Sequence, residues 1–302
     1  MSEGARRPRL EQITPGIYAY VQPDGSWFLN NTGFLVGNDG VTVIDMCGTE
    51  SRSRLFLDAL RSTTPRPVRT LVNTHAHQDH THGNYLLTGA VIVGHERCRD
   101  AILAMGVGNP LLDSIFPGVD WGHLEAAPPT LTFTDRLTLF VDDVEVQLIH
   151  IGPAHTDHDV VAWVPSRRTL FAGDLCFNGG HPNNVGGSIS GTIAAMAALT
   201  NLDPEVVVPG HGDVCGPSVF TDMTSYMEKV RSVARDGLAA ALTPLDAARQ
   251  ADMSAFSTWL DRERLVGNLH RAYAEITGGT VDLQAALGDM IAFNGGPLRC
   301  LA

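Results

Sequence analysis

The chain has 302 residues, of which 44% are hydrophobic and 18% charged, and its formal net charge is −12 at neutral pH. These values are typical of a folded globular protein, and no run of about eighteen apolar residues predicts a membrane-spanning helix. The negative charge disfavours nucleic acid and anionic membranes as partners. Five scattered cysteines without a C-x-x-C pair, and an N-terminus without an apolar export segment, predict a cytoplasmic protein with reduced thiols.

The first part of the chain alternates short β-rich runs with helical stretches. Strands are expected over residues 17–21, 28–36 and 41–45, followed by a helix over 51–62 and a strand over 68–72. The run at 41–45 ends in a carboxylate. This alternation is typical of an α/β protein.

A second β-rich region begins near residue 131 and is followed by a further helix and strand. Two halves of this kind predict a sheet packed on a sheet with helices outside, an α/β, four-layer αββα sandwich. The later sequence is mostly helical, including a long helix expected over 254–277. We therefore predict a sandwich domain at 1–216 and a C-terminal helical extension at 217–302 that packs on it.

The segment 73–84 reads N-T-H-A-H-Q-D-H-T-H-G-N and directly follows an expected strand. His75 and His77 are two positions apart, so they can converge on one ion from an extended loop. Asp79 and His80 come next, where the chain can turn toward a second ion. Imidazole nitrogens and carboxylate oxygens suit zinc and similar divalent ions. The alternative is a solvated, histidine-rich loop.

Three further fragments place a polar residue at the carboxyl end of an expected strand. They are G-P-A-H-T with His155, F-A-G-D with Asp174 and P-G-H-G with His211. A lone histidine or aspartate in such a place is usually a turn residue. Open α/β sheets, however, hold their ligands at this edge, so four fragments in this order favour one metal centre.

As a set, the four fragments resemble those of the metallo-β-lactamase superfamily, over roughly residues 15–216. The resemblance implies seven metal ligands in two groups: His75, His77 and His155 for one ion, and Asp79, His80 and His211 for the other, with Asp174 bridging. It implies two Zn²⁺ per chain, with iron or manganese as alternatives, and a bridging water or hydroxide as the nucleophile. Asp79 would be the catalytic residue that orients this nucleophile and shuttles its proton, and Asp45 matches the supporting acidic position.

The bridging position separates branches of this superfamily. The best-known β-lactamases use a cysteine for the second metal, whereas Asp174 and His80 are similar to the glyoxalase II-like thioesterase, lactonase and phosphodiesterase branches. Cys176 is then expected to be a buried thiol. The resemblance implies a hydrolase of a thioester, ester or lactone of a small acyl metabolite. The alternatives are a β-lactam hydrolase, a mononuclear-iron sulfur dioxygenase and a non-enzymatic metal-binding protein.

The helical extension is expected to pack over the mouth of the site. Together with Trp27, Phe28 and the loop 177–190, it would form a mainly apolar wall. Glyoxalase II-like enzymes bind a glutathione thioester with such a part, but no basic cluster is evident here, so a less charged acyl substrate is expected. A small molecule is the expected partner, and the sequence leaves a homo-oligomer open.

Overall fold

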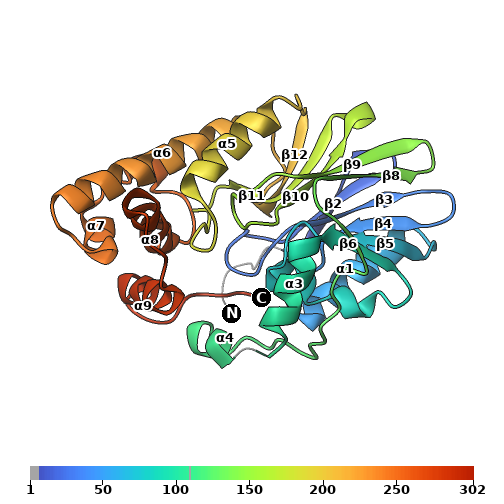
Figure 1. The fold of residues 1–302 in the computed structure, drawn as a ribbon. Coiled ribbons are helices and arrows are strands. Elements are labelled where there is room, and N and C mark those ends of the chain that lie inside the picture. Colours follow the sequence, from blue (N-terminus) through green and yellow to red (C-terminus); the bar gives the residue numbers. More distant parts are fainter. Residues whose placement is uncertain (1–6, 109) are drawn as a thin grey trace.

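The structure is a computed structural model that describes residues 7–108 and 110–302 (Figure 1). Residues 1–6, on which part of the expectation about an export segment rests, lie outside the described residues. In the described ranges, no helix has both the length and the hydropathy needed to cross a membrane.

Two β-sheets face each other at the centre of the molecule. The first sheet has seven strands in the order β1 (Arg9–Thr14), β2 (Ile17–Val21), β3 (Thr32–Val36), β4 (Val41–Ile44), β5 (Val68–Val72), β6 (Val91–His95) and β7 (Leu131–Phe133). The second has five, in the order β12 (Val206–Gly212), β11 (Thr169–Asn178), β10 (Val160–Val164), β9 (Val144–His150) and β8 (Arg136–Val141). Strands β4, β5 and β6 run parallel, as do β11 and β12, so each sheet presents carboxyl strand ends at one edge.

Helices cover the outer face of each sheet (Figure 1). Helix α1 (Glu50–Thr63) packs on the first sheet with α3 (Glu96–Met105) beside it, and α5 (Ile189–Thr200) and α6 (Ser218–Ala239) cover the second. Between the sheets, side chains such as Leu35 face others such as Leu148 in one buried cluster. The predicted αββα sandwich is confirmed.

Strand β11 lies between β12 and β10 in the second sheet and is buried along almost its whole length. Its sequence is a nearly continuous apolar run because one face packs on the first sheet and the other on α5 and α6. Asp174 interrupts that run and is itself buried. A carboxylate in such a place requires partners that offset its charge.

The strand expected over 28–36 is shorter than predicted, since β3 begins only at Thr32. Phe28 has a positive φ of 61°, and the backbone N–H of Leu29 bonds to the carbonyl of Ser26 as a turn. Asn30 then donates from Nδ2 to the carbonyl of Met46 at 2.7 Å. The apolar pair Phe28 and Leu29 therefore lies in a buried turn before the strand. The alternation of apolar and polar residues does not distinguish such a turn from the strand itself.

The helix expected over 254–277 is also wrong in its first part, because α8 begins at Arg264 (Arg264–Thr277). Before it, a short 3₁₀ turn (Ser254–Phe256) gives way to an extended residue, Leu260. Its backbone bonds to Gly179 and His181 at 3.0 and 2.9 Å, and Asp261 then takes a positive φ. This long-range backbone pairing ends the local helix.

The C-terminal extension comprises α6, α7 (Pro244–Gln250), α8 and α9 (Leu283–Asn294). Buried side chains of α6, such as Met223 and Tyr226, lie in the same cluster as Leu175 of β11. The last residues return to the first half of the chain, where the N–H of Leu298 donates to the carbonyl of Ile115 at the end of α4 (Pro110–Ile115). The extension is thus joined to the sandwich at two places.

Candidate metal centre

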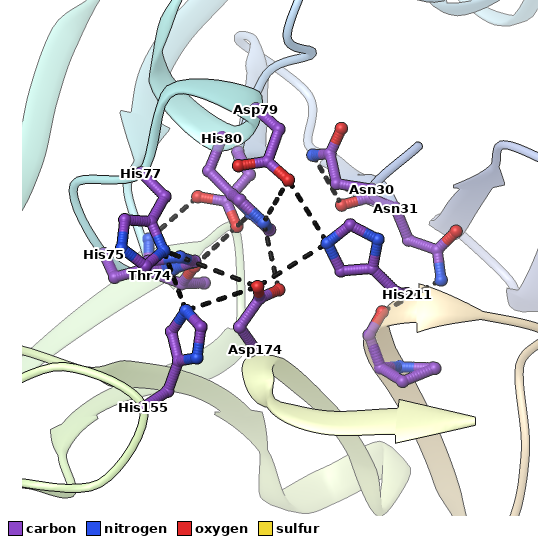
Figure 2. Close-up of polar contacts among 12 residues, drawn as sticks. Asn30, Asn31, Thr74, His75, His77, Asp79, His80, His155, Asp174 and His211 are labelled. Atoms are coloured by element: carbon purple, nitrogen blue, oxygen red, sulfur yellow. Dashed lines mark hydrogen bonds and ion pairs between the residues drawn. The ribbon is translucent and has the colours of Figure 1, made fainter. Parts of the chain in front are cut away.

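All seven predicted ligands come together at the edge where the strands end (Figure 2). Two lie in the loop after β5, two in the short helix α2 (Gln78–Thr81), one after β9, one in β11 and one in β12: His75 and His77, Asp79 and His80, His155, Asp174, and His211. Their side chains point toward one another from four separate segments of the chain, and all except His77 and Asp79 are buried. The structure therefore brings together the whole predicted set.

Three imidazoles form the first donor group. Nε2 of His75 lies 3.0 Å from Nδ1 of His77, which lies 2.8 Å from Nε2 of His155. The Oδ2 atom of Asp174 is 3.3 Å from His155 Nε2 and 3.9 Å from His75 Nε2. Three nitrogens and one carboxylate oxygen thus converge on one point.

The second donor group shares Asp174 with the first. Its Oδ1 atom lies 3.0 Å from Nε2 of His80, and its Oδ2 atom lies 3.5 Å from Nε2 of His211. Oδ2 of Asp79 completes the group at 3.2 Å from His211 Nε2 and 3.8 Å from His80 Nε2. One carboxylate therefore stands between two sets of donors.

These separations fit divalent ions. Donor atoms about 2.1 Å from a tetrahedral zinc ion lie about 3.4 Å from one another, and the distances in both groups scatter around that value. Nε2 of His80 and Oδ1 of Asp174 are buried, and although they lie 3.0 Å apart, neither makes a well-oriented hydrogen bond to any described residue. Buried polar atoms are rarely left in this way, and ions in both groups would satisfy them.

Asp45 holds the His80 ring from behind. Its Oδ2 atom is 2.8 Å from Nδ1 of His80 and accepts a hydrogen bond from the hydroxyl of Thr74, and its Oδ1 atom accepts from the Thr74 backbone N–H. With the proton on Nδ1, the Nε2 lone pair of His80 faces the donor group. Asp45 itself has a positive φ of 58° directly after β4, a conformation that aspartate tolerates better than most residues.

His211 is oriented by a backbone carbonyl. Its Nδ1 atom lies 3.1 Å from the carbonyl oxygen of Gly25, which leaves Nε2 facing Asp79 and Asp174. Asn31 fixes the strand that carries it, because Nδ2 of Asn31 donates to the carbonyls of Pro209 and Gly212 at 2.9 and 2.7 Å. The buried turn before β3 thus supports the metal centre.

Glycine is required next to His211 for reasons of space. A Cβ atom at Gly210 would lie 2.0 Å from Oδ1 of Asp174 and 2.8 Å from that residue's backbone nitrogen. Every larger residue would therefore displace the shared carboxylate. The P-G-H-G fragment thus includes a packing requirement as well as a ligand.

The protonation states of the histidines differ between the two groups. Burial lowers the pKa of His155 to about 3 and those of His75 and His77 below their ordinary value, so these rings are neutral donors. Burial acts in the same direction on His80 and His211, but the carboxylates of Asp174 and Asp79 outweigh it. The pKa of His80 therefore lies well above its ordinary value, and that of His211 rises to about 9.

Burial would raise the pKa of both carboxyl groups, but the neighbouring imidazoles reverse this effect. The pKa of Asp174 is held well below its ordinary value by His211, His80 and His155. The pKa of Asp79 is lowered by His80 and His211. Both carboxylates are consequently ionised at neutral pH and suited to bind cations.

Cys176 lies near the centre but belongs to neither donor group. Its side chain is fully buried and burial raises the pKa of its thiol well above the ordinary value, as expected for an inert core thiol. His158 supports the ligand loop, since its Nε2 atom accepts from the N–H of Ala76 at 3.2 Å. The Nδ1 atom of His181 lies 2.9 Å from the hydroxyl oxygen of Tyr226.

A cavity of about 270 Å³ opens onto the metal centre. Its polar lining comes largely from the donor groups and their neighbours: His77, Gln78, Asp79, Asp174, Asn183, His211 and Arg264. The rest is mainly apolar: Trp27, Phe28, Leu112, Ile115, Phe116, Phe177, Val185, Gly186, Leu283, Leu287, Met290 and Leu298. The expected apolar wall from Trp27, Phe28, the 177–190 loop and the extension is therefore present.

Sequence reasoning did not find several residues that shape this site. Thr74, Gly25 and Asn31 act through contacts that are distant in sequence, and Asn183 lines the cavity. Arg264 of α8 was also missed, because nothing near it in the sequence resembles a ligand motif. The buried turn before β3 did carry a signal, an Asn-Asn pair inside an otherwise apolar run.

The fold and the donor set agree with those of a known protein family. A family model described as the metallo-beta-lactamase superfamily matches residues 25–211. That match covers more than half of the chain, so the chain belongs to the metallo-β-lactamase superfamily, whose members are metal-dependent hydrolases and related enzymes. Every residue of both donor groups lies within the matched region.

Three curated relatives illustrate the range of proteins to which this chain is similar. The alpha subunit of 2,4-dinitroanisole O-demethylase from a Nocardioides species is 28% identical over 210 residues, which span 68% of this chain and 56% of that protein. A type 2 metallo-beta-lactamase from Bacteroides fragilis is 21% identical, over 70% of this chain and 82% of its own length. A linear primary-alkylsulfatase from a Pseudomonas species is 23% identical, over 67% of this chain and 44% of the sulfatase.

Solved structures confirm the architecture. A metallo-beta-lactamase from Pontibacter korlensis superposes with a TM-score of 0.62 at 19% identity, over 73% of this chain and 99% of that one. The DIM-1 metallo-beta-lactamase gives a TM-score of 0.59 at 18% identity, over 74% of this chain and 98% of its own. At these identities the likeness concerns the fold.

Proposed function

We propose that this chain is a binuclear metal hydrolase that cleaves a thioester, ester or lactone of a small, mainly apolar acyl compound. The observation that carries the proposal is the position of Asp174, one carboxylate shared by two complete donor groups at the floor of an apolar cavity. Two zinc ions are the proposed occupants because the donors are imidazoles and carboxylates.

Bound divalent ions at these two groups would supply a Lewis acid for the scissile carbonyl and would lower the pKa of a water molecule toward neutrality. The chain supplies the remaining requirements. The first group and Asp174 fix the donor geometry, and the support of His80 by Asp45 and of His211 by Gly25 limits movement of the rings. The apolar lining excludes bulk water from the reacting atoms.

Asp79 is the proposed catalytic residue. Its carboxylate lines the cavity with a side chain that is 13% exposed, whereas the other donors of its group are almost fully buried. Because its pKa is lowered, it is ionised at neutral pH, and it can accept a hydrogen bond from a water molecule in the cavity. It would orient that water toward the acyl carbon and pass its proton to the leaving group.

The test is a hydrolysis panel combined with metal analysis of protein purified without added metal. We expect about two zinc ions per chain and turnover of acyl-thioesters, aryl esters or lactones, with a loss of at least a hundredfold in Asp79→Asn. About one iron per chain with no hydrolysis would instead support a sulfur dioxygenase. β-Lactams, alkyl sulfates and aryl methyl ethers belong in the panel, because turnover of one of these alone would assign a different substrate class.

A further inference from the structure

Among the described residues that line the cavity, Arg264 is the single lysine or arginine. It lies at the first position of α8 and is 1% exposed, which is unusual for an arginine. It belongs to the C-terminal extension and lies outside the region 25–211 that matches the superfamily. A buried cation beside a metal centre therefore needs its own explanation.

The contacts of Arg264 leave part of its guanidinium free. Nη1 donates to the carbonyl of His181 at 3.0 Å, Nη2 lies 2.9 Å from Oδ2 of Asp261, and Cζ lies 4.0 Å above the ring of Trp27. Nε is buried and has no hydrogen-bond partner in the described parts of the chain. A guanidinium has five N–H donors, so this one keeps at least the Nε–H without an acceptor among the described residues, and its side chain lines the cavity.

A stack of planar groups connects Arg264 with the metal centre. The ring of Phe177 lies parallel to that of His211, with centroids 4.9 Å apart, and Arg264 Cζ lies 5.3 Å from the Phe177 ring. One aromatic ring therefore separates the cation from a metal ligand. A short, extended molecule in the cavity can reach both ends.

A second residue of the lining has an unpaired polar atom, but that atom is an acceptor and would not itself bind a carboxylate. Oδ1 of Asn183, which also lines the cavity, is buried and unpaired within the described ranges. Asp261 offsets the charge of Arg264 in part, so recognition would depend on directed hydrogen bonds as well as on charge. Hydrogen bonds between a guanidinium and a carboxylate are among the strongest in proteins, and a surrounding of low dielectric strengthens them further.

We propose that Arg264 binds a carboxylate at the far end of the substrate from the scissile bond. The substrate class is then an apolar acyl ester, thioester or lactone with a terminal carboxylate, held between the metal centre and Arg264. The chemistry at the scissile bond rests on the proposed function, whereas the carboxylate site does not depend on it. A cavity of about 270 Å³ limits the apolar part to a short chain or one ring.

A purely structural role for Arg264 makes a different prediction. The residue would then only brace Trp27 against α8, where Nε1 of Trp27 also donates to Oε1 of Glu263 at 2.6 Å. In that case a second carboxylate on a ligand would weaken binding, because it would lose its hydration in an apolar cavity. The two roles are therefore distinguished by whether a second carboxylate on the ligand strengthens or weakens binding.

The first measurement uses the unmodified protein with its metals bound. Calorimetry compares hexanedioate with hexanoate, because each can place one carboxylate on the metals and only hexanedioate has a second for Arg264. We expect hexanedioate to bind at least tenfold more tightly. Equal binding, or tighter binding of hexanoate, overturns the proposal without any variant.

The second measurement uses Arg264→Gln and the matched control Arg262→Gln, which removes the same charge from an exposed residue two positions away. We expect Arg264→Gln to reverse the order of the two ligands and Arg262→Gln to keep it. Arg264→Lys, which retains the charge without the planar donors, should fall between them. Unchanged preference in folded, metal-loaded Arg264→Gln overturns the proposal.

The two proposals fail in different ways. If no member of the hydrolysis panel is turned over but hexanedioate binds in an Arg264-dependent manner, the hydrolase assignment falls and the carboxylate site stands. If acyl esters are hydrolysed but a terminal carboxylate gives no preference in binding, the carboxylate site falls and the hydrolase assignment stands.

Discussion

Oδ2 of Asp45 lies 2.8 Å from Nδ1 of His80, on the side of the ring opposite Asp174. This contact fixes which nitrogen of His80 faces the metal centre. Asp45→Asn removes the charge but keeps a residue that tolerates the positive φ at this position. We expect the second donor group to lose about 10–100-fold in zinc affinity, as is common when a supporting partner is removed.

Competition with a chromophoric chelator measures this loss. Asp58→Asn is the control, since Asp58 is an exposed carboxylate of α1 that pairs with Arg61. Undiminished affinity in Asp45→Asn would show that the His80 ring is held by its packing alone.

Asp174 and Cys176 lie two residues apart in β11, but substitutions at these two positions should have very different effects on metal content. Asp174→Ala removes the carboxylate that both donor groups share, so both ions should be lost or bound far more weakly. Cys176→Ala removes a buried thiol that belongs to neither group and should leave both in place. Metal content after exhaustive buffer exchange provides the measurement, and retention of two ions by Asp174→Ala would contradict the shared-ligand assignment.

Zinc binding to chelator-treated protein should depend on pH differently at the two groups. Metal must displace protons from His80 and His211, whose pKa values are raised, that of His211 to about 9. Below that pH, each protonated histidine lowers the apparent affinity about tenfold per pH unit. His75, His77 and His155 have lowered pKa values, so their ion should persist into mildly acidic solution.

Zinc titrations at several pH values, together with proton release measured in weakly buffered solution, check this expectation. The second ion should release protons and the first should release few. Equal pH dependence of the two binding steps would show that the carboxylates do not hold protons on His80 and His211.

Gly210→Ala should weaken metal binding, although Gly210 is not itself a ligand. The new methyl group would overlap Oδ1 of Asp174, which would have to leave the position between the two donor groups. We expect both ions to bind at least tenfold more weakly by chelator competition. Gly186→Ala is a suitable control, because a Cβ at that position meets no atom within 4 Å.

The apolar wall can be tested at Leu283, which lines the cavity and is 53% exposed. Leu283→Glu places a charge beside the apolar part of a bound substrate, so KM should rise about fivefold or more for an apolar acyl ester, with unchanged metal content. Leu103→Glu is the matched control, since Leu103 is also 53% exposed and lies on α3 away from the cavity. An equal effect in both variants would point to general destabilisation.

Much of the site could be predicted because its chemistry lies in short local segments. His75, His77, Asp79 and His80 are nearly adjacent in sequence, and the other ligands follow apolar runs whose carboxyl ends meet at one edge of a sheet. The layers followed from the order of β-rich and helical stretches. These features need only local patterns and general rules of α/β packing.

The remaining features depend on contacts between distant segments. The break before α8 arises because Leu260 pairs with the backbone of residues 179–181, and no property of residues 254–263 alone indicates it. The placement of Arg264 over Trp27 follows from that break. Gly25, which orients His211, lies 186 positions away from it.

The metal centre and the apolar wall come from different parts of the chain. Every donor lies within residues 25–211, whereas much of the wall comes from α9 and the last residues through Leu283, Leu287, Met290 and Leu298. Substitutions in α9 can therefore change which molecules enter without altering the ligands of either ion. A directed-evolution library confined to one face of α9 should therefore change substrate selectivity most, with the smallest risk to the chemistry.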